Sequence, residues 1–366
     1  MSNPVDVATV QNDDPSTPAI WVGTYTADAG GGSQGIYSIG VDSQGSFVSG
    51  GLAVAAPSPS FVAVHPTLPI VYAVHEFAGT VAAYRRDGES GLVAVGDAWP
   101  TGAAGCHVAV DPDGRFIVVN CWGDGKVLLF ELDATGQITA RFEAERAVDP
   151  YAAGSDSALT SDRQSRAHAS IVLDDGRIMS TDLGFDLVRL WHYEPGQGLV
   201  ADSAVVLGRG AGPRHLAQHP NGRVYIDTEY SIEAAVLERT VEGGFVVHSV
   251  GPATFGGAQD GDAAAELAFS ADFRFVYVGV RGSNRISTLA VDESGRTRPV
   301  ADTPCGGSWP RHHLVFGERL LVANERSGTV AIFTLDADSG VPAAIVGHLP
   351  IASPTALIAA APRVRA

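Results

Sequence analysis

The chain has 366 residues, with 24 lysines and arginines against 41 aspartates and glutamates, so its formal net charge is −17. This excess of negative charge argues against nucleic acid or an anionic membrane as a partner, since both require a basic face. No stretch approaches the roughly 20 apolar residues of a membrane-spanning helix. A small anionic ligand remains compatible with this composition if arginines gather locally.

Residues 1–18 are polar and acidic, unlike a signal peptide, and we expect them to form a flexible tail before a single domain at residues 19–362. The domain is long, but repeat folds exceed ordinary domain sizes, and 43 glycines and 21 prolines supply many turns. The three cysteines, Cys106, Cys121 and Cys305, are an odd number, which favours free thiols in a reducing compartment. The sequence therefore predicts a cytoplasmic protein.

Two short phrases recur along this domain. The first occurs at residues 59–66 (PSFVAVHP), 106–112 (CHVAVDP) and 214–220 (RHLAQHP). Aligning its copies places seven residues at one repeat position, with successive differences of 46, 63, 45, 51, 46 and 44: Phe61, His107, Ser170, His215, Glu266, His312 and Ala356. The second phrase is a small turn followed by an alternating, β-branched strand, and it also occurs seven times. These spacings predict a propeller of seven four-stranded blades.

The two ends of the domain complete each other. Residues 21–25 read as a strand with no copy of the first phrase before it, whereas residues 354–359 are a copy with no strands after it. We therefore predict an all-β, seven-bladed β-propeller of antiparallel blades, with its ring closed by one C-terminal strand joining three N-terminal strands. Such closure leaves no free sheet edge.

Polar residues gather where the start of the innermost strand of a blade lies beside the end of its second strand. The starts carry His107, Arg214, His215, Glu266, Arg311 and His312, and the second-strand ends carry His75, Glu76, Asn120, Asp182, Glu229, Arg281, Asn324 and Glu325. Convergent titratable groups predict a binding or catalytic site at one mouth of the central channel. The plainer interpretation is a water-filled channel whose polar groups only satisfy one another.

Residues 21–26 (WVGTYT), 106–115 (CHVAVDPDGR), 212–217 (GPRHLA) and 309–311 (WPR) carry a resemblance to a known family. The chain resembles, over about residues 20 to 360, the seven-bladed lactonases that include propeller-type 6-phosphogluconolactonase and fungal carboxy-cis,cis-muconate cyclase. The resemblance implies a lactonase acting on a sugar-acid lactone, with 6-phosphogluconolactone or a related aldonolactone as substrate.

The resemblance has one departure and one insertion. Where the family usually shows a His-Pro-His-Ser stretch, this chain has Ala167-His168-Ala169-Ser170, so a catalytic role of either family histidine would pass to His168 or be lost. The enlarged spacing before Ser170 corresponds to a polar insertion at residues 141–166. We expect the insertion to form a loop that covers the mouth of the channel, with a disordered surface insertion as the alternative.

Lactone hydrolysis needs a base to activate water, donors that stabilise the tetrahedral oxyanion, and an acid for the leaving alkoxide. We assign Arg214, Arg281 and Arg311 to the substrate, because guanidinium groups match planar anions and keep their charge when desolvated. Glu229 and Glu266 are the candidate base and acid. Three histidines, which titrate near neutrality, compete for the same roles: His107, His168 and His215.

The remaining mouth residues are predicted to contact substrate: Glu76, Asn120, Asp182 and Asn324. We expect metal-free acid–base catalysis and no cofactor, although the oxygen donors at the mouth would also suit a hard cation such as calcium or magnesium. Two other functions stay open, since the same groups could run a cycloisomerase that forms or opens a lactone of an unsaturated acid, and propellers also serve as binding platforms. The expected partner is a small anionic lactone or organic acid.

Overall fold

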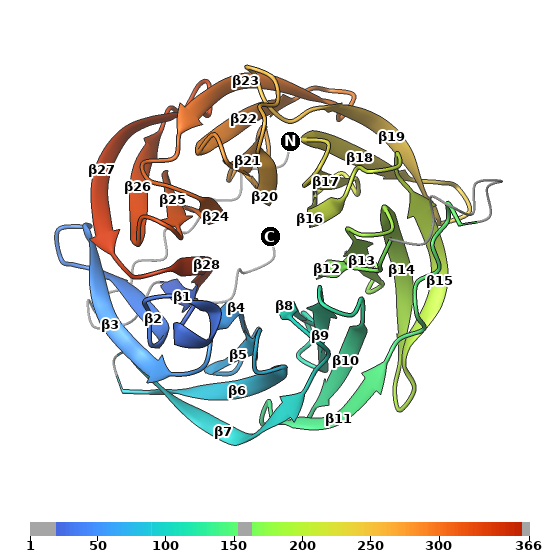
Figure 1. Ribbon diagram of the computed structural model, residues 1–366, viewed down its shortest axis with the longest axis horizontal. Coiled ribbons are helices and arrows are strands. Elements are labelled where there is room, and N and C mark those ends of the chain that lie inside the picture. The colour runs from blue at the N-terminus through green and yellow to red at the C-terminus, as the bar shows by residue number, and fades with distance from the viewer. Residues whose placement is uncertain (1–19, 89, 153–162, 361–366) are drawn as a thin grey trace, which may run out of the picture.

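Short alternating segments build the whole molecule. In the computed structural model, which describes residues 20–88, 90–152 and 163–360, 28 β-strands form seven four-stranded antiparallel sheets, with one short 3-10 helix, η1 (Ala27–Ala29). The sheets follow one another around a central axis as the blades of a propeller (Figure 1). The predicted all-β fold with seven blades is therefore confirmed.

Each blade is named here by its strands, from the innermost to the outermost. The first three regular blades are β4 (Pro59–Val64), β5 (Ile70–His75), β6 (Thr80–Asp87) and β7 (Gly91–Pro100); β8 (Gly105–Val110), β9 (Phe116–Cys121), β10 (Val127–Leu132) and β11 (Ile138–Glu143); and β12 (Ala167–Val172), β13 (Ile178–Asp182), β14 (Leu187–Glu194) and β15 (Gly198–Val206). The next three are β16 (Pro213–Gln218), β17 (Val224–Thr228), β18 (Glu233–Arg239) and β19 (Phe245–Pro252); β20 (Ala263–Phe269), β21 (Phe275–Arg281), β22 (Arg285–Val291) and β23 (Thr297–Pro304); and β24 (Pro310–Phe316), β25 (Arg319–Asn324), β26 (Thr329–Leu335) and β27 (Pro342–Pro350).

The seventh blade closes the ring. Its innermost strand is the C-terminal β28 (Pro354–Ala359), which pairs with β1 (Ile20–Thr24), and β2 (Gly35–Val41) and β3 (Phe47–Ala55) complete the sheet. The pairing brings Ile20 opposite Ala359 and Trp21 opposite Ile358. One C-terminal strand and three N-terminal strands therefore share a blade, as the sequence predicts.

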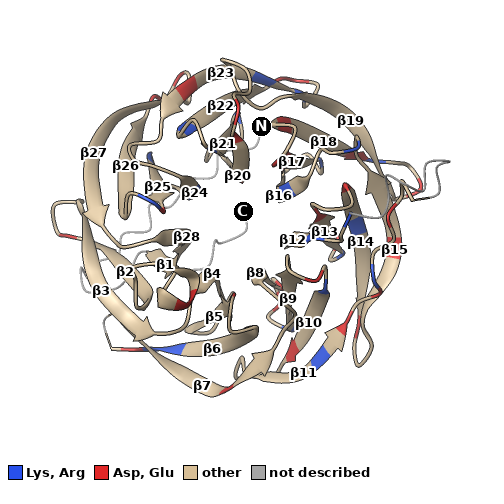
Figure 2. Ribbon diagram, in the orientation of Figure 1, with Lys and Arg blue, Asp and Glu red and all other residues tan. Residues whose placement is uncertain are grey.

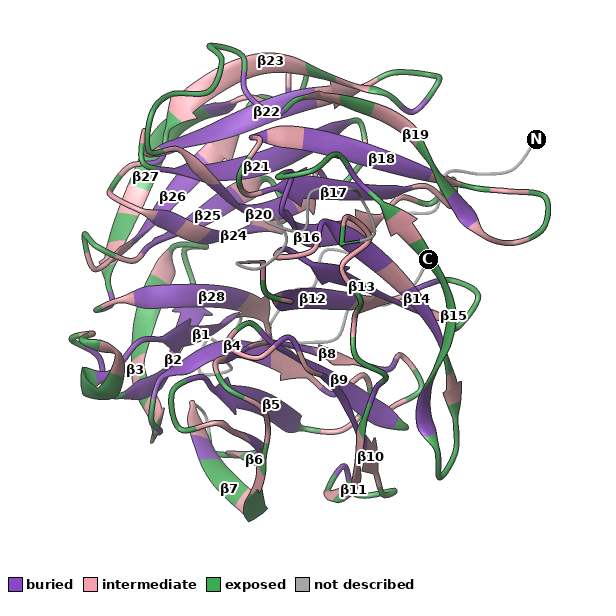
Figure 3. Ribbon diagram, turned by 45° about the vertical axis from the view of Figure 1, so that its right-hand side comes forward, coloured by how far each residue is buried: buried purple, intermediate pink, exposed green. Residues whose placement is uncertain are grey.

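Burial follows the position of a strand within its blade. The second strands β5, β9, β13, β17 and β21 are buried at every residue, because neighbouring blades cover both of their faces. The outermost strands, such as β3, are mostly exposed or half-buried (Figure 3). Charged residues lie mainly on these outer strands and on the loops, with a basic segment on β16 near the centre of the ring (Figure 2).

The hydrophobic core is divided among the interfaces between blades. Seven clusters of buried apolar residues lie between adjacent blades. Burial of one large aliphatic or aromatic side chain contributes about 1.5–3 kcal/mol. Three second-strand tyrosines add a bond across an interface: the hydroxyls of Tyr72, Tyr225 and Tyr277 donate to the carbonyls of Gly136, Gly295 and Gly340 at 2.6–2.7 Å.

Several predicted features lie partly or wholly outside the described residues. These are the tail at residues 1–18, the last two residues of the predicted domain, and the tip of the insertion at residues 153–162. None of the helices in the part of the chain that the structure describes is long and apolar enough to span a membrane.

Candidate active site

Every innermost strand carries an irregularity at its second or third residue, where the pairing with the second strand shifts register. One residue is unpaired in β4, β8, β24 and β28, and two are unpaired in β12, β16 and β20. A β-bulge of this kind redirects side chains out of the regular alternation. The bulges contain five of the predicted site residues: His168, Arg214, His215, Glu266 and Arg311.

The residue directly after each second strand forms the other half of the site. The strand pairings place seven residues at this equivalent position: Tyr25, Glu76, Trp122, Leu183, Glu229, Gly282 and Glu325. Six of them, all except Gly282, donate their backbone N–H to the carbonyl just before the innermost strand, at 2.7–3.1 Å. Five of the six acceptor residues have left-handed φ, including Trp309 at 67°. The backbone thus holds each of these side chains beside a bulge.

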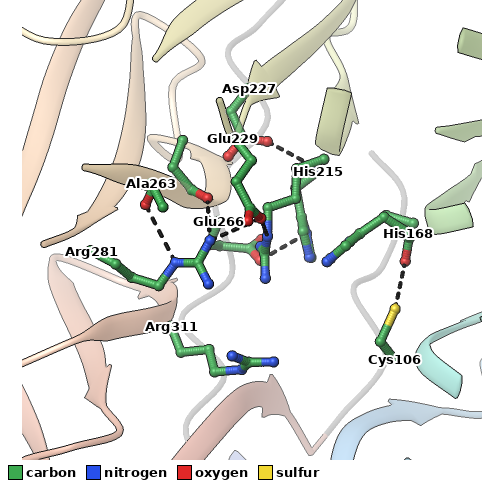
Figure 4. Close-up of polar contacts among 12 residues, drawn as sticks. Cys106, His168, His215, Asp227, Glu229, Ala263, Glu266, Arg281 and Arg311 are labelled. Carbon is green, nitrogen blue, oxygen red and sulfur yellow. Dashed lines mark hydrogen bonds and ion pairs between the residues drawn. The ribbon is translucent and has the colours of Figure 1, made fainter. Parts of the chain in front are cut away.

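Arg214 and Arg281 converge on one carboxylate. Arg214 Nε and Arg281 Nη2 each lie 2.9 Å from Glu229 Oε2, and Arg281 also donates to the carbonyl of Ala264 at 2.9 Å (Figure 4). Burial, followed by the charge of Arg214, lowers the pKa of Arg281 to about 10. The Arg214 side chain is only 4% exposed, yet its Nη1 has no hydrogen-bond partner among the described residues. A buried guanidinium donor therefore faces the site.

A second carboxylate, Glu266, holds two imidazoles. Its Oε2 lies 2.8 Å from His215 Nδ1 and 3.3 Å from His312 Nε2. The proton of His312 is on Nε2, because its Nδ1 accepts the N–H of Leu357. His215 instead donates from Nδ1, which leaves its Nε2 as an acceptor. Burial lowers the pKa of His312 to about 3 and that of His215 well below its usual value, so both rings are uncharged at neutral pH.

The other predicted histidines share the channel with His215. The ring centroids of His107 and His168 both lie 5.4 Å from that of His215, and Phe61 packs 4.3 Å from His107. His107 Nδ1 accepts the N–H of Ser170, so its proton is on Nε2. Burial lowers the pKa of both histidines well below the usual value. Figure 4 shows the His168 ring pointing toward His215.

Asp227 is a site residue that the sequence analysis missed. It is opposite the double bulge of β16 and accepts the backbone N–H of His215 at 2.7 Å, which replaces the bond that the bulge removes. Thr181 does the same in the neighbouring blade, where its hydroxyl oxygen accepts the N–H of Ala169 at 3.1 Å. Burial raises the pKa of Asp227 to about 8. Only the position of the bulge, which single-sequence patterns do not give, could have identified it.

The remaining arginine of the mouth belongs to a different cluster. Arg311 Nη2 donates to the hydroxyl oxygen of Tyr25, and this hydroxyl donates to Glu76 Oε2 at 3.0 Å. Arg311 Nη1 lies 3.6 Å from Glu325 Oε2. Tyr25 was missed because the innermost strand of its blade comes from the other end of the chain. Cys106, which the sequence analysis predicts only to be a free thiol, is half-buried, and its Sγ lies 3.4 Å from the carbonyl oxygen of His168.

Three predicted substrate contacts are bonded within the strands and turns. Asn120 Oδ1 accepts the hydroxyl of Ser170 at 2.7 Å, and Asn324 Nδ2 donates to the carbonyl of Cys305 at 3.0 Å. Asp182 accepts backbone N–H groups, including that of Arg166 at 2.8 Å. All three are almost fully buried. A role for them in substrate binding stays a prediction.

The oxygen donors proposed for a hard cation do not form a common group. Glu229 is shared by two arginines and Glu76 accepts from Tyr25, while the side chains of the two asparagines have the partners given above. Within residues 20–88, 90–152 and 163–360, no group of three or more His, Cys, Asp or Glu side chains is arranged to hold a metal ion. Metal dependence stays open to experiment.

Two short motifs in the chain do not form sites of their own. Residues 31–35 (GGSQG) match Gly-x-Ser-x-Gly, but the buried Ser33 hydroxyl has no hydrogen-bond partner within the described residues, so no base activates it. His215 and His219 have the spacing His-x-x-x-His. They stand at opposite ends of β16, where His219 Nδ1 accepts the N–H of Asn221 at 3.1 Å. The two rings therefore do not converge on one ion.

The described flanks of the insertion are attached beside the β12–β15 blade. The Tyr151 hydroxyl donates to the carbonyl of Leu207 at 2.5 Å, just after β15, and Arg163 pairs with Asp149 at 3.0 Å and with Asp186 at 2.5 Å. The predicted covering of the mouth depends on residues 153–162, which lie outside the described part of the chain.

Known proteins are similar to this chain in sequence and in architecture. A 6-phosphogluconolactonase of Bacillus subtilis is 32% identical over 339 residues, which cover 87% of this chain and 92% of that protein. A 6-phosphogluconolactonase of Formosa agariphila is 25% identical, covering 77% and 82%. The structure of the periplasmic gluconolactonase of Pseudomonas aeruginosa matches with a TM-score of 0.82 at 26% identity, covering 93% of this chain and 99% of that one. The family model described as lactonase, 7-bladed beta-propeller, matches residues 19–359. The chain therefore belongs to the seven-bladed β-propeller lactonase family.

Proposed function

We propose that this protein hydrolyses the lactone of a sugar acid, with 6-phosphogluconolactone or a related aldonolactone as substrate. One observation carries the proposal: a single bulge presents an uncharged imidazole held by a carboxylate, His215, and an arginine nitrogen without a partner among the described residues, Arg214 Nη1. Family membership and the similarity to the 6-phosphogluconolactonase of Bacillus subtilis support the substrate class.

His215 is the proposed general base. Because its Nδ1 donates to Glu266, its Nε2 lone pair can take a proton from water while the water oxygen attacks the lactone carbonyl carbon. Burial keeps the pKa of His215 low, so the ring enters the reaction unprotonated. Glu266 then stabilises the imidazolium that forms, as the carboxylate does in other carboxylate–histidine pairs.

Arg214 is the proposed donor to the carbonyl oxygen. The attack places negative charge on this oxygen, and a desolvated guanidinium stabilises such charge strongly because little water screens it. Glu229 fixes the orientation of Arg214 and Arg281 by accepting from both. Its contacts therefore favour a positioning role over the acid–base role that the sequence analysis assigned to it.

The leaving oxygen receives the proton from His215. When the tetrahedral intermediate collapses, the ring C–O bond breaks and the imidazolium returns its proton to the alkoxide, which becomes a hydroxyl of the open acid. His107, with its proton on Nε2, and His168 lie beside His215. We assign them to holding the water or the leaving oxygen by hydrogen bonds.

The experiment is a panel of three lactones, 6-phosphoglucono-1,5-lactone, unphosphorylated gluconolactone and muconolactone, each assayed with and without chelator. The pH is kept low enough to suppress spontaneous opening. The proposal predicts saturable hydrolysis of an aldonolactone by the wild type and its loss in His215→Gln, with His248→Gln on the outer strand β19 as the matched control. Dependence on metal would show as loss of activity in the chelator arm.

Other results on the panel would overturn the proposal. Turnover of muconolactone alone, accompanied by ring closure of the unsaturated acid, would indicate a cycloisomerase. Inactivity on all three lactones, with tight binding of one of them, would indicate a binding platform. A cytoplasmic location and a small anionic partner remain predictions from the sequence.

A further inference from the structure

The site contains the same sequence pattern twice. Pro213-Arg214-His215 in β16 and Pro310-Arg311-His312 in β24 both start the innermost strand, and each follows a left-handed residue, with φ of 68° at Gly212 and 67° at Trp309. Glu229 and Glu325 occupy equivalent positions, because each directly follows the residue that pairs with the proline of its own copy. The fold therefore places an arginine–glutamate pair at two points of one mouth, separated by a single blade.

The two copies differ in their balance of charge. In the first copy, two guanidinium groups, those of Arg214 and Arg281, share one carboxylate. In the second copy, the single guanidinium of Arg311 lies between Glu325 at 3.6 Å and the Tyr25 hydroxyl that is bonded to Glu76. The arginines of the first copy are thus two cations on one carboxylate, whereas the second copy has two carboxylates for one cation.

Aromatic rings complete the second copy. The Arg311 guanidinium lies 4.8 Å from the centroid of the Tyr25 ring, and Phe77 packs edge-on against that ring at 5.7 Å. Phe77 is 53% exposed, so a ligand at Tyr25 can also contact its ring. Burial raises the pKa of Tyr25, so its hydroxyl keeps its proton and can both donate and accept.

This second cluster lies within electrostatic reach of the proposed base. The charge of Arg311 contributes to lowering the pKa of His215 and of His168. Figure 4 shows the Arg311 guanidinium pointing into the space that Arg281 and His215 also face. A substrate whose carbonyl carbon is beside His215 can therefore reach this cluster with its remaining atoms.

Carboxylates and a phenol recognise hydroxyl groups, because they accept hydrogen bonds from them, and the same carboxylates repel a phosphate dianion. We propose that Tyr25, Glu76, Arg311 and Glu325 form a polyol-binding subsite that holds the hydroxyl-bearing end of the lactone and disfavours a phosphate ester there. The inference rests on the proposed lactonase function and specifies which part of the site selects among sugar-acid lactones.

The test compares kcat/KM for glucono-1,5-lactone and its 6-phosphate in the wild type and in Glu325→Gln. Removing one carboxylate charge is expected to raise the preference for the phosphorylated lactone about tenfold, since the repulsion acts on a doubly charged group. Glu76→Gln is expected to shift the ratio in the same direction. Glu293→Gln, on the turn at the opposite end of β22, removes the same charge far from the mouth and should leave the ratio unchanged.

The outcomes separate this inference from the function on which it rests. A wild type that hydrolyses neither lactone overturns both. Hydrolysis by the wild type, with an unchanged ratio in two folded variants, overturns the subsite alone. Where Glu325→Gln or Glu76→Gln fails to fold, the other variant decides, and calorimetric binding of gluconate against 6-phosphogluconate must show the same shift in preference.

Discussion

The two ends of the innermost strands use the same residue types for different purposes. At the end opposite the mouth, His65 Nδ1 accepts the N–H groups of Thr67 and Leu68 at 3.2 and 3.0 Å, and Asp111 accepts that of Arg115 at 3.1 Å. These side chains close tight turns. At the mouth, bulges turn the histidines and carboxylates toward one another instead. The register of the backbone, rather than residue type, therefore separates a turn cap from a candidate catalytic group.

Among substitutions that compare the two ends of the strands, Arg214→Ala is expected to lower kcat the most. The substitution removes the proposed donor to the oxyanion, and loss of one such donor lowers kcat by about 10²–10³-fold. Arg115→Ala, at the opposite end, removes an arginine that pairs with Asp111 at 2.7 Å and should leave kcat unchanged. Steady-state hydrolysis of the preferred lactone, with thermal unfolding as a check of folding, measures both. Equal rates in the two variants would refute the assignment of Arg214.

A smaller loss is expected for Glu266→Gln. Glutamine can still accept the Nδ1–H of His215, but it carries no charge to stabilise the imidazolium, so kcat should fall by about tenfold to a hundredfold with little change in KM. Glu131→Gln is the control, because Glu131 accepts the Tyr193 hydroxyl at 3.0 Å at the opposite end of the strands. A change confined to KM would argue that Glu266 only binds substrate.

The sequence predicted the ring better than the contacts within it. Repeat spacing is enough to count blades, because each blade must bury its faces against two neighbours. The split blade was predicted because the first strand at the N-terminus has no copy of the first phrase before it. The site depends on register instead. Asn120, for example, is one residue earlier than the true strand end at Cys121, and a shift of one residue turns a side chain to the other face.

The contacts of Tyr25 and Asp227 show why sequence patterns do not predict the partners of polar side chains at the mouth. Tyr25 and Arg311 are bonded although they are 286 positions apart. Asp227 acts through the N–H of His215, which only a bulge leaves unpaired. Single-sequence reasoning finds which positions are polar at the mouth, but the partner of each polar group is decided by the curvature of the ring and by the bulges.

A moderate effect on stability is expected for Asp227→Asn. The folded-state pKa of Asp227 is about 8, against 3.8 in the unfolded chain, so the folded state binds the proton more tightly. Its contribution to stability is present at low pH and is lost as the pH rises through about 8. Asparagine keeps the acceptor for His215 and does not titrate.

The measurement for this variant is Tm between pH 7.5 and 9, a range in which histidines are largely neutral both in the folded protein and in the unfolded chain. The wild type should lose a few degrees more than Asp227→Asn across it, since about 1 kcal/mol corresponds to a few degrees for a chain of this size or smaller. Asp338→Asn, on an exposed turn, should titrate like the wild type. Parallel curves for all three proteins would show that the Asp227 carboxyl is ionised in the folded state.

The smallest effect is expected at the other end of the channel, for His65→Ala. This change leaves the N–H groups of Thr67 and Leu68 without their acceptor, which should lower the free energy of unfolding by about 1 kcal/mol. His65→Asn should restore most of the loss, because an asparagine side chain can accept the same N–H groups in a turn. Catalysis should be unaffected in both variants, since His65 caps a turn rather than facing the cluster around His215. A fall in kcat/KM without loss of stability would mean that His65 takes part in catalysis and does not only cap a turn.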